Sequence, residues 1–172
     1  MYINDKPYES TPSREGNPKQ CKENIMSTSI LKRSLTSTQT TATLPLRLIA
    51  GIIFSAHGAQ KLFAWFGGYG LEGTGQWMES IGLSPGYLMA LGAGSAEFFG
   101  GLLLLLGLFT RLSSVLLAFT MIIAIFSVHI SNGLFMSNNG YEFGLALLGI
   151  SLALAIQGGG KFALDNVIVN KL

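Results

Sequence analysis

The chain has 172 residues, of which 49% are hydrophobic and only 12% are charged, and its mean hydropathy is +0.46. Since a soluble domain usually carries about a quarter charged residues, this composition excludes a soluble globular enzyme. The net charge of +2 lies entirely in residues 1–43, so the apolar remainder has no basic stripe with which to bind nucleic acid.

The chain divides into three segments by composition. Residues 1–43 are rich in Ser, Thr, Pro, Asn and Lys and are predicted to form a disordered cytoplasmic tail. Residues 44–160 are predicted to form a domain of four transmembrane helices, and residues 161–172 a cytoplasmic C-terminal tail. Cys21 is the single cysteine of the sequence, so an internal disulfide and a CxxC redox pair are excluded. Any redox role would therefore need a diffusible cofactor or a partner subunit.

Four apolar stretches predict transmembrane helices and an all-α, up-down bundle. The first stretch has 21 residues, about 31 Å as a helix, which is enough to cross the hydrocarbon core of a bilayer. The connection that follows it is expected to be a glycine-rich loop with a short helix over residues 75–81. The four stretches are Leu46–Phe66, Gly86–Leu108, Leu112–Ser131 and Glu142–Gln157.

The distribution of Lys and Arg predicts the orientation of these helices. Basic residues lie at the start of the first helix, in the turn between the second and third, and after the fourth. Residues 67–85 and 132–141 contain neither Lys nor Arg. By the positive-inside rule, both termini are expected to be cytoplasmic and these two loops to lie on the outer side of the membrane.

Ionisable side chains at membrane depth indicate the candidate site, because each costs several kcal/mol unless it is paired or hydrated. On the first helix, Arg47, His57 and Lys61 share one face, which is expected to point into the bundle. On the second helix, Glu97 lies among small residues, a pattern typical of close approach by another helix backbone. A similar stripe of small residues begins at Glu142 on the fourth helix.

Residue counts from the predicted outer helix ends place His57 and Glu97 level near mid-membrane, about 14 to 16 Å deep. Lys61 lies at about 8 Å, within side-chain reach of Glu142 or His129 nearer the surface. We interpret this series of acidic and basic residues at successive depths as a polar pocket for a small ligand or for protons. The alternative is a set of ion pairs that fixes the helix register. The residues assigned to the pocket are His57, Glu97 and Lys61 as catalytic residues and Arg47, His129 and Glu142 as binding residues.

Two further patterns are rejected, and no metal site is predicted. His57 and His129 do not fit a bis-histidine haem site, because their depths differ by about 10 Å. His129 is also expected to lie opposite the stripe of Thr120 and Ser127 on its helix. The GxGxxG pattern of residues 68–73 follows a membrane helix rather than a strand, so a flexible outer loop is expected instead of a dinucleotide site.

Several motifs follow one another in a specific order and spacing. They are Arg47-Leu-x-x-Gly51, His57-Gly58-x-x-Lys61, Glu97-x-x-Gly100-Gly101, Gly107-x-x-Thr110-Arg111, His129-x-x-x-Gly133-Leu-Phe, Gly140-Tyr-Glu142 and Gly160-x-x-x-Leu164-Asp165. Together they resemble the DoxX family of small four-helix bacterial membrane proteins, over about residues 46–166. The glycines at 158–160 depart from the family pattern, in which a proline often lies between glycines.

The resemblance implies a multi-pass protein of the bacterial inner membrane. Some members are similar to the DoxD-type subunit of a thiosulfate:quinone oxidoreductase or terminal quinol oxidase, so a quinone is the cofactor that the resemblance implies. Three functions stay open: a membrane subunit of a quinone-linked oxidoreductase, a small proton-coupled transporter, and a non-catalytic scaffold for a soluble redox enzyme. Whether the chain is itself an enzyme is left open. The expected partners are the lipid bilayer, a redox-enzyme subunit and further copies of the chain in a homo-oligomer.

Overall fold

The computed structural model describes residues 40–171, and every regular element in that range is helical. The prediction of an all-α chain is therefore confirmed for these residues, whereas the predicted tail of residues 1–43 lies almost entirely outside them. The helices are α2 (Thr43–Phe63), α3 (Gly70–Ser80), α4 (Gly86–Leu106), α5 (Thr110–Ala124), a π-helix (Ile125–His129), α6 (Glu142–Gln157) and α7 (Leu164–Val169), with 3-10 helices at Trp65–Gly67, Ile130–Asn132 and Met136–Asn138.

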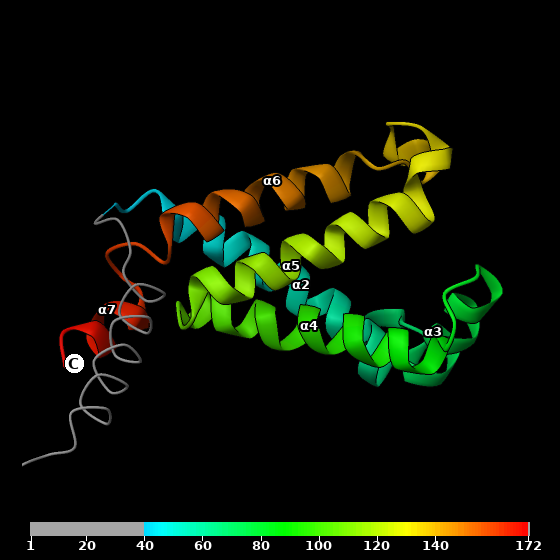
Figure 1. Ribbon diagram of the computed structural model, residues 1–172, viewed down its shortest axis with the longest axis horizontal. Coiled ribbons are helices and arrows are strands. Elements are labelled where there is room, and N and C mark those ends of the chain that lie inside the picture. The colour runs from blue at the N-terminus through cyan, green and yellow to red at the C-terminus, as the bar shows by residue number, and fades with distance from the viewer. Residues whose placement is uncertain (1–39, 172) are drawn as a thin grey trace, which may run out of the picture.

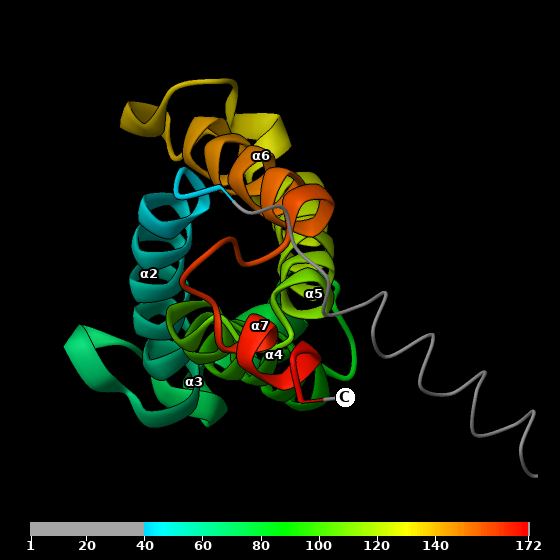
Figure 2. The same ribbon diagram turned by 90° about the vertical axis from the view of Figure 1, so that its left-hand side faces the viewer.

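The long helices α2, α4, α5 and α6 lie alongside one another, and Figure 2 looks along their length. Phe54, Leu104, Leu117 and Leu154 are fully buried between them and form the apolar core. One end of the molecule carries α3 and the loop of residues 133–141, and the other end carries α7 and the turn between α4 and α5 (Figure 1). The two ends therefore differ in structure. They also differ in charge, because the connecting segments at the first end contain no Lys or Arg whereas those at the second end do.

Glycines allow α2 and α4 to approach each other closely. A Cβ atom on Gly58 would lie 2.6 Å from the Cα of Phe98, and one on Gly101 would lie 2.6 Å from the backbone nitrogen of Ser55. These contacts confirm the close approach predicted for the small residues of α4, and they show that α2 and α4 run antiparallel. On α6, a Cβ on Gly149 would meet no atom within 4 Å, so the close packing expected of that stripe is not made.

The observed helix bounds depart from the predicted ones mainly around the turns. Helix α6 begins and ends as predicted, and α2 begins and ends three residues earlier than predicted. The predicted short helix is instead the longer helix α3, which starts at Gly70 and includes part of the GxGxxG pattern, so the expectation of a flexible loop there is wrong.

A carboxylate joins α3 to α4. Glu79, near the end of α3, accepts hydrogen bonds from the backbone N–H of Gly86 at 2.6 Å and from the Ser84 hydroxyl at 2.9 Å. These two donors hold the pKa of the Glu79 carboxyl below its ordinary value. The Glu79 carboxylate also satisfies a backbone N–H donor at the start of α4, which begins without a local side-chain cap.

Among the described helices, two segments are long and apolar enough to cross a membrane: Gly86–Leu106 and Thr110–Asn132. Helix α6 is apolar but shorter, with 16 residues. Helix α2 has the length of a span, but Arg47, His57 and Lys61 lower its hydropathy. Length and composition therefore support two of the four predicted spans directly.

The chain segment after α6 packs against the start of α2. The Arg47 side chain is 2% exposed and donates hydrogen bonds to the carbonyl oxygens of Gly159 at 2.9 Å and Phe162 at 3.3 Å. The Thr43 hydroxyl donates to the same Gly159 oxygen at 3.1 Å. The beginning of α2 is thus tied to the residues that follow α6.

Asp165 of α7 ties the same segment to α5. Its carboxylate is 1% exposed and accepts hydrogen bonds from the backbone N–H groups of Phe109 at 2.6 Å and Thr110 at 3.0 Å. Since Phe109 provides no side-chain cap for α5, Asp165 serves as its N-terminal cap from a distant part of the sequence. Within the segment predicted as a C-terminal tail, residues 161–171 therefore contribute a helix and a buried carboxylate to the packed structure.

Candidate functional site

A cavity of about 760 Å³ lies among the long helices, toward the end of the molecule that carries α3 and the 133–141 loop. Its volume falls within the usual range for small-molecule sites, and its walls are mostly apolar with a few polar side chains, as is typical of such sites. The polar wall residues are His57, Lys61, Glu97, Thr120, Ser127, His129 and Asn139, and the aromatic ones are Phe54, Tyr69, Trp77 and Phe143.

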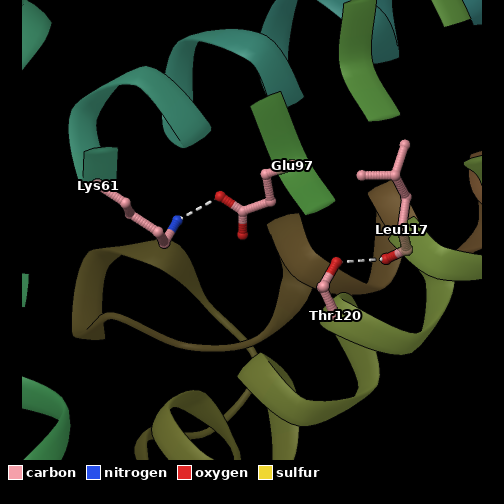
Figure 3. Close-up of polar contacts among 4 residues, drawn as sticks. All are labelled: Lys61, Glu97, Leu117 and Thr120. Carbon is pink, nitrogen blue, oxygen red and sulfur yellow. Dashed lines mark hydrogen bonds and ion pairs between the residues drawn. The ribbon is translucent and has the colours of Figure 1, made fainter. Parts of the chain in front are cut away.

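An ion pair between α2 and α4 forms part of the cavity wall. Figure 3 shows Lys61 and Glu97 reaching toward each other, with Lys61 Nζ 2.5 Å from Glu97 Oε2. The Glu97 side chain is 5% exposed and that of Lys61 is 23% exposed. The same view contains Thr120, whose hydroxyl donates to the carbonyl oxygen of Leu117 at 2.8 Å. The site therefore has a buried carboxylate whose charge is balanced by a partly accessible ammonium.

This pairing corrects the one expected from helix depth. The residue counts place Glu97 level with His57, and Lys61 within reach of Glu142 or His129, whereas in the structure Lys61 and Glu97 pair with each other. The reason is that side chains on a helix lean toward its N-terminus. Because α2 and α4 are antiparallel, Lys61 and Glu97 lean toward each other.

His57 lies on the cavity wall one helical turn before Lys61. Its side chain is exposed in the structure, and its ring centroid lies 6.1 Å from that of Phe143 on α6. His57 is therefore within the site, but as an accessible imidazole beside an aromatic ring rather than as the partner of Glu97.

His129 lies on the same cavity wall as Thr120 and Ser127, although the sequence predicts the opposite face. The prediction assumed a continuous α-helix, whereas the chain becomes a π-helix at Ile125–His129. A π-helix takes more residues per turn, which changes the direction of every side chain after its start. Both histidines therefore face one cavity, and the argument that separated them by face is wrong.

Two predicted site residues lie away from the cavity wall. Arg47 is bound to carbonyl oxygens near α7, at the other end of α2. Glu142 accepts a hydrogen bond from the backbone N–H of Met136 at 2.6 Å and so fixes the 133–141 loop. Of the ionisable residues predicted to line a pocket from the outer surface to mid-membrane, four therefore lie on the cavity wall: His57, Lys61, Glu97 and His129.

Several wall residues were missed because they lie in the segments that connect the predicted membrane spans. Asn139 and Trp77 reach the cavity from the 133–141 loop and from α3. The sequence gave only an indirect indication of these two residues: both connecting segments contain glycines, with polar or aromatic residues between the glycines. The spacing of Thr120 and Ser127, seven residues apart, was a better signal, since it corresponds to two helical turns.

The site combines hydrogen-bonding side chains with largely apolar walls. Lys61 offers hydrogen-bond donors, Glu97 balances its charge, and the imidazoles of His57 and His129 can each donate or accept. Within residues 40–171, no group of three or more His, Cys, Asp or Glu side chains lies close enough to hold a metal ion.

The sequence matches a known protein family and several bacterial proteins. The DoxX family matches residues 42–130. A Bacillus subtilis (strain 168) protein named "Putative oxidoreductase CatD" is 44% identical over 72% of this chain and 84% of its own length. The Inner membrane protein YqjF of Escherichia coli (strain K12) is 32% identical over 73% of this chain and 90% of its own. An uncharacterized Haemophilus influenzae protein is 33% identical over the same shares. No solved structure is significantly similar to the chain.

Proposed function

The chain belongs to the DoxX family of membrane proteins, and we propose that it is the membrane subunit of a quinone-linked oxidoreductase whose quinone binds in the cavity. The observation that carries this proposal is the Lys61–Glu97 ion pair on the wall of an otherwise apolar cavity of about 760 Å³. A relative that is 44% identical is named as an oxidoreductase, which agrees with this chemistry.

The chemistry of a quinone matches these walls. A quinone ring is flat and apolar and has carbonyl oxygens that accept hydrogen bonds, and Lys61 is a charged donor to such an oxygen. Reduction of a quinone takes up two electrons and two protons. A redox-enzyme partner supplies the electrons, while Lys61 and a protonated His57 each pass one proton to a quinone oxygen and are protonated again from water on the outer side, and the Glu97 carboxylate stabilises the ammonium that Lys61 regains.

We further propose that α2, α4, the α5–π segment and α6 all cross the bacterial inner membrane as an up-down bundle. The low hydropathy of α2 does not oppose this, because Arg47 is buried and Lys61 is paired inside the protein rather than exposed to lipid. The cavity then opens toward the outer side, and both termini are cytoplasmic by the positive-inside rule.

Reporter fusions test this topology. Fusions after Ser131 and after Asn170 are expected to report opposite sides of the membrane, since these residues lie at opposite ends of the helices. The measurement is the activity of a reporter that works on only one side. Matching readings from the two fusions would contradict the four-span arrangement.

Quinone binding can be measured through Trp77, which lies on the cavity wall. The chain has two tryptophans, and Trp65→Phe leaves Trp77 as the single tryptophan, whose fluorescence can be excited selectively over that of the tyrosines. A short-chain quinone titrated into this variant in lipid nanodiscs is expected to quench Trp77 fluorescence to saturation. The double change Lys61→Met/Glu97→Gln is expected to weaken binding about tenfold or more, because it removes a charge-assisted hydrogen bond.

The matched control is Lys161→Met, since Lys161 lies at the other end of the molecule and is outside the cavity. It makes the same chemical change as Lys61→Met and is expected to leave the quinone affinity unchanged. Quenching that does not saturate, or that Lys161→Met weakens as much as Lys61→Met/Glu97→Gln does, would contradict a quinone site in this cavity.

A further inference from the structure

The π-helix at Ile125–His129 sets the direction of the His129 side chain. π-helical turns are rare and occur frequently at functional sites, because they cost regular hydrogen bonding and must be supported by other contacts. Here the turn brings His129 to the cavity wall that also carries Thr120 and Ser127. The backbone is thus built to present this imidazole to the cavity.

A fixed carbonyl group holds one nitrogen of the His129 ring. His129 Nδ1 lies 2.8 Å from the backbone oxygen of Asn139, which also accepts a hydrogen bond from Asn132 Nδ2 at 3.3 Å. Asn139 has a left-handed backbone with φ of 58°, a strained conformation that Asn tolerates better than most residues. The Glu142 carboxylate supports this loop by accepting the Met136 N–H at 2.6 Å.

This contact determines the tautomer of the neutral imidazole. A backbone carbonyl oxygen carries no hydrogen and can only accept, so His129 Nδ1 must carry the proton and donate it. The other ring nitrogen, Nε2, then has no proton and is a hydrogen-bond acceptor. Since Nδ1 is occupied by the loop, Nε2 is the nitrogen that His129 offers to a ligand.

We infer that His129 Nε2 accepts a hydrogen bond from a ligand hydroxyl, and hence that the cavity binds a hydroquinone more tightly than the corresponding quinone. This inference rests on the proposed function and adds to it the preferred redox state of the ligand. A hydroquinone hydroxyl donates to Nε2, whereas a quinone carbonyl oxygen would bring a lone pair against the lone pair of Nε2. Lys61 does not discriminate in this way, because both a hydroxyl oxygen and a carbonyl oxygen accept its hydrogen bond.

The experiment compares three probes on the full-length protein in nanodiscs, under argon and at pH 8. The probes are a short-chain quinone, its hydroquinone and the dimethyl ether of that hydroquinone, which keeps the ring but has no hydroxyl to donate. Wild-type protein is expected to bind the hydroquinone about tenfold more tightly than either of the others, the usual effect of one hydrogen bond. Affinities are measured by isothermal titration calorimetry.

Variants of the two cavity histidines separate the role of His129 from a general need for imidazole. His129→Phe is expected to abolish the tenfold preference, and His129→Gln, whose amide oxygen can accept, to keep part of it. His57→Phe makes the same change on the other cavity histidine; it is expected to weaken the binding of quinone and hydroquinone alike, and hence to keep the preference between them. Circular dichroism spectra check that each variant is folded.

The outcomes distinguish this inference from the proposed function. Binding of quinone and hydroquinone with equal affinity by wild-type protein would overturn the inference and leave the quinone site in place. A preference that survives His129→Phe would overturn it as well. Absence of binding for all three probes would overturn both the proposed function and the inference.

Discussion

Replacement of Lys61 by methionine is expected to lower the free energy of unfolding by about 3 kcal/mol. The Glu97 side chain is only 5% exposed, so loss of Lys61 leaves its carboxylate in an apolar environment without a counter-charge. Removal of one partner of a buried ion pair typically costs about 3–5 kcal/mol, and the lower value applies because Lys61 is 23% exposed. Glu97→Gln is expected to cost less, since the Lys61 ammonium can turn toward the cavity.

The double variant Lys61→Met/Glu97→Gln is expected to recover most of the stability lost in Lys61→Met. Neither residue is then charged, so no ion is left buried without a partner. The measurement is thermal unfolding in detergent of the wild type, both single variants and the double variant, combined as a double-mutant cycle.

His57→Leu is the control for the alternative pairing that helix depth predicts. His57 is exposed to the cavity and Glu97 is already paired with Lys61, so this change is expected to cost much less than Lys61→Met. If His57→Leu proved as destabilising as Lys61→Met, or if the double variant were less stable than Lys61→Met, the assignment of the ion pair would be wrong.

The ion pair shows what the sequence could and could not predict about the site. That charged residues of the first helix face a carboxylate among small residues of the second was predictable from helical periodicity. The relative depth of these residues in the membrane was not predictable, because the residue count assumed that all helices end at the same level. Gly58 lies against Phe98, so α4 starts about seven residues, or about 10 Å, beyond the end of α2. Glu97 is therefore level with the stretch between His57 and Lys61.

His129 shows a second limit of what the sequence can predict about the site. Its presence near the outer end of the third helix was predictable, but its direction depends on a π-helix that hydrophobic periodicity does not reveal. The contact that holds it, with the Asn139 carbonyl, depends on the left-handed backbone of a loop that carries no regular pattern. Local geometry of this kind is determined by tertiary contacts rather than by residue type.

Replacement of Asp165 by alanine is expected to destabilise the protein by about 3–5 kcal/mol. Its carboxylate is 1% exposed and accepts the backbone N–H groups of Phe109 and Thr110, which begin α5. Each buried donor left without an acceptor costs about 1–3 kcal/mol, and the negative charge also stabilises the N-terminus of the helix. Arg47, buried at the same end of the bundle, would lose its electrostatic interaction with the Asp165 carboxylate as well.

Asp165→Asn tests whether the carboxylate acts as this two-oxygen acceptor. The amide keeps one acceptor oxygen but turns an NH₂ group toward the second backbone donor, so about half of the alanine effect is expected. Unfolding temperatures in detergent measure both changes, with Glu72→Ala on the exposed face of α3 as the control for loss of an acidic side chain. A truncated chain that ends after Gln157 lacks the segment that carries Asp165, and it is therefore expected to be at least as unstable as Asp165→Ala.

If Asp165→Ala had the stability of the wild type, α5 would not need this cap. The segment after α6 would then be a tail, as its composition alone predicts.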